Sequence, residues 1–477
     1  MKYIKLLSLV WIIVCLSYAE SQEICDIPPL DPPVVERIQN RTYPSIALPG
    51  SSLVAENPLR WFPWDDLEVF YETYAKHDIA YYAFLYGLQS NIRPPKPNYG
   101  LATSLAGNLE SATHMRQEFL QRNPNFIVIP EIRLHNHFST EAFPSDSEFW
   151  LRNTDGQVHK HDVPWDEFSL NILNPKVQQL LIERVVGLAK CGLYDGVLFD
   201  AFYAYHVHQY EPHGIATEQE VIEVYRTILK GIRERVRDDF LILVNRNMNK
   251  TPRFAEWING SFMETGRGDP GYTYAELIEI EDALLWNEKN LREPRINILQ
   301  GYGVFESFDS PNNLRLMRIF TTMSLTHSDG YSIFRVPREI DGYIQHTHIW
   351  YQFWDAPLGR PIGEKGQLYD NREGVFIREF TNGWAVYNRS GKKQEIDLPE
   401  NATGWQSGQR NITHVVDDLD GEIYLKSVVP AEDVNSDGIV NILDLVRVAN
   451  GMGGVHPDVN GDGIVNILDL VRVANAF

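Results

Sequence analysis

The chain has little cysteine and little positive charge, and each shortage excludes a class of protein. Three cysteines among 477 residues are too few for a disulfide-stapled scaffold or a cysteine-rich zinc site. Lysine and arginine number 43 against 64 aspartate and glutamate residues, which gives a net charge of −21. Such an acidic chain argues against a nucleic-acid partner, because phosphate binding needs clustered basic side chains. Neutral substrates, cations and other proteins remain as partners.

Long apolar runs are also scarce, and the clearest one lies at the N-terminus. Residues 1–19 join two lysines to an apolar run and then to small residues, which is the pattern of a secretory signal peptide. The run is short for a membrane span, which takes about 20 apolar residues. We therefore expect a secreted protein, extracellular or at the cell surface, without membrane contact after cleavage. Cleavage would remove Cys15, and the sequence leaves open whether Cys25 and Cys191 pair.

The rest of the chain divides by composition and pattern. We expect a linker or strap at 20–57, a barrel at 58–360, a small antiparallel β-domain at 361–428 and calcium-binding repeats at 429–477. The strap is rich in proline, and the β-domain consists of short strand-like runs between turn residues.

The long middle segment alternates strand-like runs with helical patterns. The candidate strands are 58–63, 79–86, 125–133, 194–200, 240–246, 260–264, 296–302 and 330–335. Asn174 before a proline predicts one helix start, and a capping box at Thr217 and Glu220 predicts another. Eight β–α units in about 300 residues predict a (β/α)8 TIM barrel in an α/β protein. An open doubly wound sheet is less favoured, because no glycine-rich phosphate turn follows an early strand.

Three of these strands are entered through an Asp-Gly or Asn-Gly pair, at 195–196, 259–260 and 329–330. Glycine, aspartate and asparagine tolerate a left-handed backbone conformation. We therefore expect that conformation at these pairs, where the chain leaves a helix and enters a strand.

Carboxylates follow apolar strands at places where a barrel enzyme keeps its active site. Asp200 closes the fourth candidate strand, Glu264 closes the sixth, and Glu131 lies within the third. The C-terminal ends of barrel strands line the catalytic mouth, and paired carboxylates carry out glycoside hydrolysis. One acid attacks or stabilises the anomeric carbon while the other protonates the departing oxygen. A strand-end acid can equally be a helix cap or the partner of an arginine.

Aromatic, amide and cationic side chains near the same strand ends fit a sugar cleft, because aromatic faces stack on sugars and polar groups bind hydroxyls. The substrate-binding candidates are Tyr203, His206, Asn245, Arg246, Arg335 and Glu131. The substrate would be a polysaccharide or oligosaccharide.

Histidine pairs offer a competing interpretation. His135 with His137 and His206 with His208 could hold a metal ion in a barrel metallohydrolase. A third pair, at 346 and 348, has the same spacing. Further ligands would be needed at later strand ends, and no histidine follows strands five or six. We therefore expect no cofactor in the barrel.

The C-terminus contains a near-perfect repeat, because 433–450 and 458–475 differ only at Ser436 and Gly461. Oxygen-bearing side chains at loop positions 1, 3, 5, 9 and 12, a glycine at 6 and a carbonyl at 7 are typical of calcium loops. The expected ligands of two calcium ions are Asp433, Asn435, Asp437, Ile439, Asn441 and Asp444, then Asp458, Asn460, Asp462, Ile464, Asn466 and Asp469. Each loop precedes one amphipathic helix, and we expect folding coupled to calcium.

These two units resemble a type I dockerin, the calcium-dependent module that docks secreted enzymes onto cohesin domains. The resemblance covers about 47 residues and implies a two-fold-related face for a cohesin-like partner. Loop positions 10 and 11 carry Ile442–Leu443 and Ile467–Leu468, where many dockerins carry small hydroxyl residues. A different partner, or a contact within the chain, is therefore also open.

The segments YDGVLFDAFY and SFMETG, together with GVFIREFTNGWAVYNRS, resemble glycoside-hydrolase-like barrels of bacterial secreted proteins. Acids on strands four and six also resemble the α-galactosidase and α-glucosidase clan, which implies Asp200 as nucleophile and Glu264 as acid/base. Glu264 departs from the aspartate usual in that clan. Retention would need carboxyl groups about 5–5.5 Å apart, against about 6.5–9.5 Å for inversion. The alternative is a non-catalytic carbohydrate-binding or assembly protein.

Overall fold

The computed structural model describes residues 23–49, 67–81, 85, 88–89, 104–133, 136–137, 143–160, 168–200, 202, 207, 210, 214–266, 271–340, 343–426, 430–435 and 437–477. The expected signal peptide at 1–19 and the expected strand at 58–63 lie outside these residues. Within the described part of the chain, no helix combines the length and apolar character that a membrane crossing needs.

Parallel strands form a closed (β/α)8 barrel, which confirms the predicted fold class. The strands are β2 (Ala47–Pro49), β3 (Ile79–Tyr81), β6 (Ile127–Ile129), β7 (Glu131–Arg133), β10 (Gly196–Asp200), β11 (Leu241–Asn245), β12 (Gly260–Glu264), β13 (Ile298–Tyr302) and β14 (Tyr331–Ile340). Each pairs in parallel with the next, and β6 and β7 are halves of one strand on either side of Pro130. A parallel bridge between Ile46 and Ser332 joins the first strand to the eighth and closes the ring.

The first described barrel strand, β2, lies inside the segment expected to be a strap. Its three residues are followed by a gap in the described chain, and prolines surround it in the sequence. A run this short gives no recognisable alternation, which is why the sequence pattern did not reveal it.

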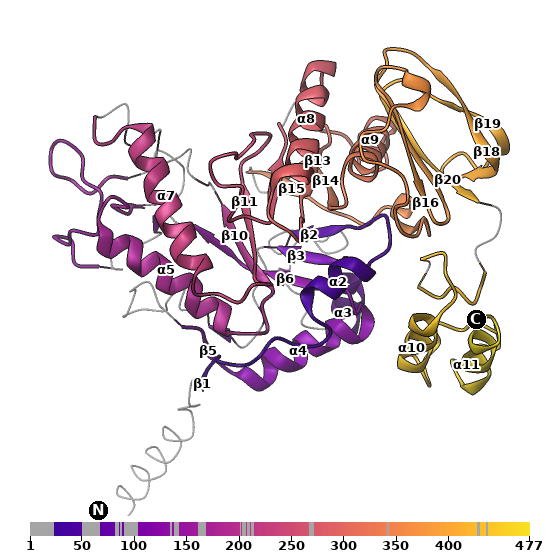
Figure 1. Ribbon diagram of the computed structural model, residues 1–477, viewed down its shortest axis with the longest axis horizontal. Coiled ribbons are helices and arrows are strands. Elements are labelled where there is room, and N and C mark those ends of the chain that lie inside the picture. The colour runs from indigo at the N-terminus through magenta and orange to yellow at the C-terminus, as the bar shows by residue number, and fades with distance from the viewer. Residues whose placement is uncertain are drawn as a thin grey trace, which may run out of the picture.

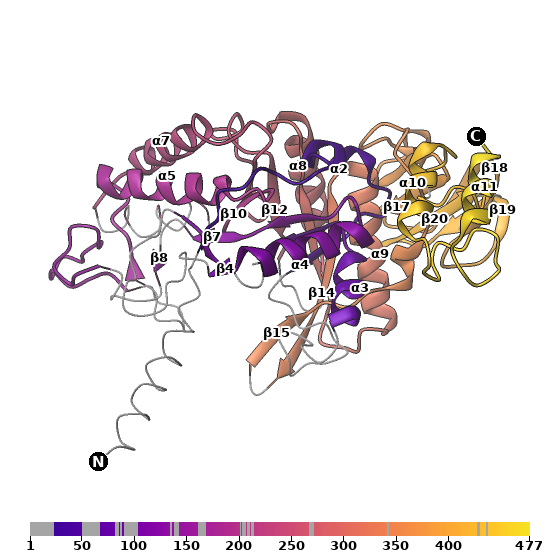
Figure 2. The same cartoon turned by 90° about the horizontal axis from the view of Figure 1, so that it is seen from below.

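Helix α2 (Val34–Asn40) packs on the N-terminal end of the barrel, where Val34 and Ile38 join its interior cluster. The helices around the barrel are α3 (Leu67–Ala75), α4 (Leu109–Arg122), α5 (Pro175–Lys190), α7 (Glu218–Arg233), α8 (Tyr274–Asn290) and α9 (Pro311–His327). Helices α5 and α7 lie side by side on one flank, and α8 and α9 lie together on another (Figures 1 and 2). The Asn174 side chain caps α5, and the box of Thr217 and Glu220 caps α7, as predicted.

Short strands complete this part of the chain: β1 (Glu23–Ile24), β4 (Leu88–Gln89), β5 (Ala106–Gly107), β8 (Asn136–His137), β9 (Phe168–Ser169) and β15 (Tyr343–Thr347). Cys25, next to β1, forms a disulfide with Cys191 at the end of α5. The disulfide therefore ties the N-terminal segment to the outer helices.

The glycines that enter β10, β12 and β14 do not have the left-handed backbone that we expected. Their role is close approach to the neighbouring strand. A Cβ atom would lie 2.3 Å from Leu241 O at Gly196, 1.7 Å from Ile296 O at Gly260 and 2.1 Å from Asn297 O at Gly330. Any side chain would therefore collide with backbone that cannot move aside.

A five-stranded antiparallel sheet follows the barrel, which confirms the predicted β-domain. Its strands are β16 (Val375–Phe380), β17 (Gly383–Asn388), β18 (Gln394–Gly404), β19 (Arg410–Val416) and β20 (Asp420–Lys426), in the order β16-β17-β20-β18-β19. One face packs on α9, where residues such as Phe320 and Phe376 share a core. The sheet and the final repeats lie on the opposite side of the molecule from α5 and α7 (Figure 1).

Each C-terminal repeat forms one loop and one helix, α10 (Ile442–Asn450) and α11 (Ile467–Ala474). The two helices contact each other through a small core that includes Val448, Val465 and Val473.

The interior of the barrel is a separate apolar cluster. It includes Ile79, Tyr81, Ile129, Leu198, Leu243, Phe262, Ile298 and Ile333. Because strand side chains alternate between two faces, the residue two positions after each of these also faces the barrel axis. The strand ends of this inner face form the candidate site.

Candidate active site

Three polar residues end three consecutive strands on the inner face. Asp200, Asn245 and Glu264 are the last residues of β10, β11 and β12, and each stands two positions after an inward-facing apolar residue. Alternation therefore points all three side chains toward the axis at the C-terminal ends of the strands. Parallel closure brings them to one mouth although 64 positions separate the two acids in the sequence.

The amide of Asn245 connects the two carboxylates. Its Nδ2 atom donates to Asp200 Oδ1 at 2.9 Å and to Glu264 Oε2 at 3.1 Å. Asp200 Oδ1 and Glu264 Oε2 can therefore lie no farther apart than the sum of these two distances. That limit is below the about 6.5 Å at which separations typical of inverting glycosidases begin. Asn245, expected as a sugar ligand, thus also fixes the geometry of the pair.

A buried chain of hydrogen bonds ends on Glu264. Tyr302 donates its hydroxyl proton to Glu264 Oε1 at 2.6 Å, and Gln300 Nε2 donates to the Tyr302 hydroxyl. Tyr81 in turn donates to Gln300 Oε1 at 3.1 Å. Burial raises the pKa of Tyr81 well above its ordinary value, so it is a neutral donor. Every donor in the chain points toward Glu264, so these hydrogen bonds fix the position of its carboxyl group.

Sequence reasoning missed Tyr302, Gln300 and Tyr81. The signal was present, because Ile298, Gln300 and Tyr302 alternate with apolar or small residues along one strand. Polar side chains at the inward positions of an otherwise apolar barrel strand are unusual and point to a site.

The remaining expected residues are spread around this centre. Arg335 of β14 donates from Nε and Nη2 to His346 O at 2.9 and 2.6 Å, which holds the β14–β15 hairpin. Glu131 pairs in register with Leu198, so it lies deeper in the barrel than Asp200. Arg246 is half-buried in the turn after β11. Tyr203 and His206 lie outside the described residues, so their expected roles stay predictions.

The histidine alternative rests largely on residues that are not described. His135, His206 and His208 lie outside the described residues, and the side chain of His137 is not described either. The third pair does not form a metal site, because His348 is buried against His77 with their Nε2 atoms 3.0 Å apart. Burial lowers the pKa of His348 to about 4. Among the described residues, no three His, Cys, Asp or Glu side chains form a metal-holding group by themselves.

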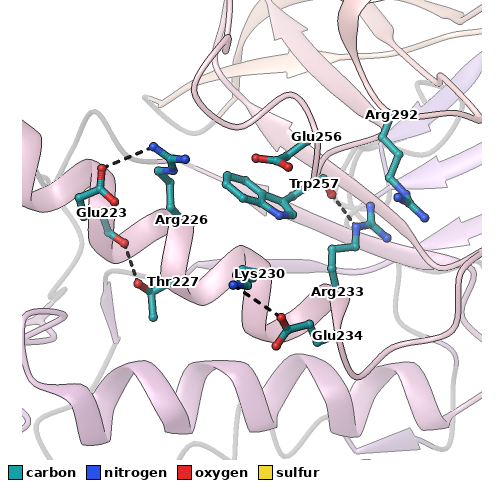
Figure 3. Close-up of a pocket in the computed structure, with 9 residues that line it drawn as sticks. All are labelled: Glu223, Arg226, Thr227, Lys230, Arg233, Glu234, Glu256, Trp257 and Arg292. Atoms are coloured by element: carbon teal, nitrogen blue, oxygen red, sulfur yellow. Dashed lines mark hydrogen bonds and ion pairs between the residues drawn. The ribbon is translucent and has the colours of Figure 1, made fainter.

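A pocket of about 670 Å³ lies beside α7, away from the C-terminal ends of the strands (Figure 3). Its lining includes Arg226, Lys230, Arg233, Trp257 and Arg292. Arg233 donates to Trp257 O and Phe240 O, both at 2.6 Å. Phe240 precedes β11, so the pocket is at the N-terminal ends of the strands, opposite Asp200 and Glu264. In Figure 3 the other cations of α7 turn toward glutamates of the same helix.

The two repeat loops have the shape that a calcium loop needs. In the first, Asp433 accepts backbone N–H groups from Asp437 and Gly438 at 3.0 and 2.8 Å, and Asp444 accepts from Asn435 and Asn441. Burial raises the pKa of Asp433, and the nearby charges of Asp437 and Asp444 add to that rise. A cation would relieve this repulsion.

The second loop repeats these contacts. Asp458 accepts from Gly463 at 2.6 Å, and Asp469 accepts from Asn460 and Asn466. Carboxylates alone do not complete either site, so the asparagine side chains and the carbonyls of Ile439 and Ile464 would supply the remaining oxygen ligands. An all-oxygen set of this kind fits calcium.

Two family models match the sequence. Residues 131–384 match the family described as hypothetical glycosyl hydrolase family 15, and residues 431–477 match the dockerin type I domain. These matches confirm the resemblances drawn from the sequence. No curated protein matches the chain.

Several solved structures are distantly similar. A cyclic α-maltosyl-(1→6)-maltose hydrolase from Arthrobacter globiformis has a TM-score of 0.47 and 11% identity over 82% of this chain and 100% of its own. A debranching enzyme from Nostoc punctiforme has a TM-score of 0.47 and 12% identity over 84% and 100%. A maltogenic α-amylase from Thermotoga neapolitana has 0.46 and 10% over 82% and 100%. Similarity this low adds nothing to the argument from the chain's own geometry.

Proposed function

Since the chain belongs to the hypothetical glycosyl hydrolase family 15, we propose that it is a secreted enzyme that cleaves O-glycosidic bonds of a polysaccharide or oligosaccharide. The observation that carries this proposal is the shared hydrogen bonding of Asp200 and Glu264 by Asn245 at the mouth of the barrel. Two acids held this close, at the end of the barrel where chemistry takes place, can act on one bond.

The reaction proceeds by double displacement with net retention. The Asp200 carboxylate attacks the anomeric carbon while Glu264 gives its proton to the departing oxygen, so one C–O bond forms as the glycosidic bond breaks. Glu264, now ionised, then takes a proton from water as that water attacks the same carbon. Asp200 leaves as a carboxylate, and both acids return to their starting states.

The surrounding residues bind the substrate. Arg335 and Arg246 carry guanidinium groups on the strand ends, Asn245 orients the two acids, and Glu131 lies deeper in the barrel. Tyr203 and His206 follow β10 in sequence. Donors that reach sugar hydroxyls set the orientation of the ring, and aromatic faces stack on it.

A hydrolysis screen with matched variants tests the catalytic assignment. Wild type should release reducing ends from one member of a polysaccharide panel. Glu264→Gln should lower the rate by about 10²–10⁴-fold, and Asp200→Asn should lower it at least as much. Asp238→Asn, a fully exposed acid on the surface, serves as the control and should leave the rate unchanged.

Azide added to alanine variants tests the roles of the two acids. With Glu264→Ala, azide should attack the glycosyl-enzyme in place of water and yield a glycosyl azide of retained configuration. With Asp200→Ala, azide should attack in place of the missing carboxylate and yield a glycosyl azide of inverted configuration. Sugar binding by wild type without turnover on any substrate would instead favour a carbohydrate-binding protein.

The C-terminal dockerin type I domain binds calcium in both loops and attaches the enzyme to a cohesin-like partner. The paired acidic loops support calcium. Circular dichroism of the isolated 430–477 segment should show helicity that rises with calcium and falls with chelator, because the oxygen ligands converge only around a cation. A double variant, Asp433→Asn with Asp458→Asn, should show no response. Equal helicity with and without calcium in the unmodified segment would refute the coupling.

A further inference from the structure

The two calcium loops are nearly identical in sequence but differ in their surroundings. Asp437, at position 5 of the first loop, has a fully buried side chain, whereas its counterpart Asp462 in the second loop is exposed. Since sequence does not explain the difference, a neighbouring part of the chain must cover the first loop. In Figure 1 the repeats lie beside the lower end of the antiparallel sheet.

The covering residues are Thr381 of the β-domain and Arg360, which directly precedes that domain. Arg360 places Nη2 2.7 Å from Asp437 Oδ2 in an ion pair, and Thr381 donates its hydroxyl to Asp437 O at 2.5 Å. Thr381 also accepts the backbone N–H of Arg360 at 3.0 Å, so the two residues act as one unit. Thr381 and Asn382 form the turn between β16 and β17.

Glycines at the same position of the two loops show the same asymmetry. A Cβ atom on Gly438 would lie 2.5 Å from Thr381 Cβ and 2.6 Å from Asn382 Oδ1. One on Gly463 would meet no atom of the described residues within 4 Å. The first loop is therefore packed against the β16–β17 turn, and the second is open.

We propose that the first repeat loop docks on the β-domain through Arg360 and Thr381, and that calcium in this loop and docking oppose each other. The proposal rests on calcium binding as proposed above. Arg360 supplies at Asp437 the positive charge that calcium would otherwise bring to the same carboxylate. The second loop has the same ligands without this contact, so it is an internal control.

Electrostatics gives the sign of this coupling. A guanidinium on a ligand carboxylate repels an incoming divalent cation and competes for its oxygen. Linkage is reciprocal, so if docking weakens calcium binding, calcium weakens docking by the same factor. Calcium at the first loop would then free the dockerin domain from the β-domain and leave it available to a partner.

Calcium titration calorimetry of the full chain separates the two sites. Asp462→Asn disables the second loop, so the first can be measured alone. In that background Arg360→Gln should tighten calcium binding by about fivefold or more, and Thr381→Val should tighten it in the same direction. Arg372→Gln, a second arginine of the β-domain that pairs with Asp370, should have no effect. With Asp437→Asn the second loop alone is measured, and Arg360→Gln should not alter it.

Small-angle scattering gives a second readout. Calcium should increase the radius of gyration of wild type, and Arg360→Gln should already be expanded in chelator. Unchanged or weaker calcium binding at the first loop in Arg360→Gln, or no change of shape with calcium, would overturn the docking proposal. Absence of calcium binding at the second loop would instead overturn the calcium proposal itself.

Discussion

Asn245 shows how one residue can set the distance between two acids. Its side-chain amide has two hydrogens on one nitrogen, and each goes to a different carboxylate. Tyr302 approaches Glu264 from the other side, so this carboxylate is held by donors on both oxygens. Arg335 and Asp200 also lie close enough to Tyr81 to affect its ionisation, so the charged groups of the mouth form one electrostatic unit.

Removal of the Tyr302 hydroxyl tests that unit. Tyr302→Phe removes a hydrogen bond to the ionised form of Glu264, so the acid keeps its proton to higher pH. The alkaline limb of the pH profile of kcat/KM should therefore shift to higher pH, and kcat should fall. Tyr331→Phe removes a buried hydroxyl elsewhere in the barrel core and should leave the profile in place. An unshifted limb in Tyr302→Phe would rule out the influence of Tyr302 on the acid.

The positions of the two acids could be predicted from sequence, and the residues that hold Glu264 were missed. An acid that ends an apolar strand is visible as a pattern, so the strand-end positions of Asp200 and Glu264 could be predicted, whereas their catalytic roles stay predictions. Tyr302 was missed although Gln300 marks its strand as unusual, because an aromatic residue at a strand end resembles core until its hydroxyl partner is known. Glu131 follows a proline that splits its strand, and only the pairing with Leu198 reveals its depth.

Elements were predictable where they were long. Strands β10 to β14 matched their apolar runs, because buried parallel strands are nearly continuous in hydrophobic residues. Strand β2 was missed because three residues give no pattern. The glycine pairs were found, but their reason was misjudged. Gly260 is needed because the backbone of Ile296 approaches it closely. Ile296 is distant in sequence, so a local sequence pattern cannot show this contact.

The contact between α9 and β16 predicts an acid-sensitive fold. His327 ends α9 and packs edge-on against Phe376 of β16, with ring centroids 4.4 Å apart. Its Nε2 atom is buried and has no hydrogen-bond partner among the described residues. Burial lowers the pKa of His327 to about 3, whereas histidine in an unfolded chain titrates near 6.5. Between these values only the unfolded chain binds the proton, so the free energy of unfolding falls as pH falls below about 6.5.

From this group the loss should reach about 2 kcal/mol at pH 5. Denaturant unfolding at pH 7.5 and pH 5 measures it. His327→Leu should recover about that amount of the difference, because no ring remains to be protonated. The exposed His114 provides the control, and His114→Gln should retain the full loss. Equal pH dependence in wild type and His327→Leu would exclude His327 as the cause.

At the scale of the whole molecule, the Cys25–Cys191 disulfide spans 166 positions. Closing so long a loop restricts the unfolded chain and stabilises the fold by about 2–4 kcal/mol. Cys25→Ser with Cys191→Ser should therefore unfold at lower denaturant, and dithiothreitol should lower the midpoint of wild type but not of this double variant. Thiol labelling of native wild type should find neither cysteine reactive. Sequence could locate the two cysteines, but only the fold could show that they meet.

Barrel closure also limits when the chain can fold. The first and eighth strands meet although they are far apart in the sequence. Tyr43, just before β2, donates a hydrogen bond to the carbonyl of Asp329, just before β14, and 286 positions separate the two residues. A ribosome must therefore release most of the polypeptide before the ring can be completed, and until then a strand edge stays open to wrong pairing. This delay suits the secretion proposed above, because a chain that cannot close early stays unfolded long enough to pass through a translocation channel.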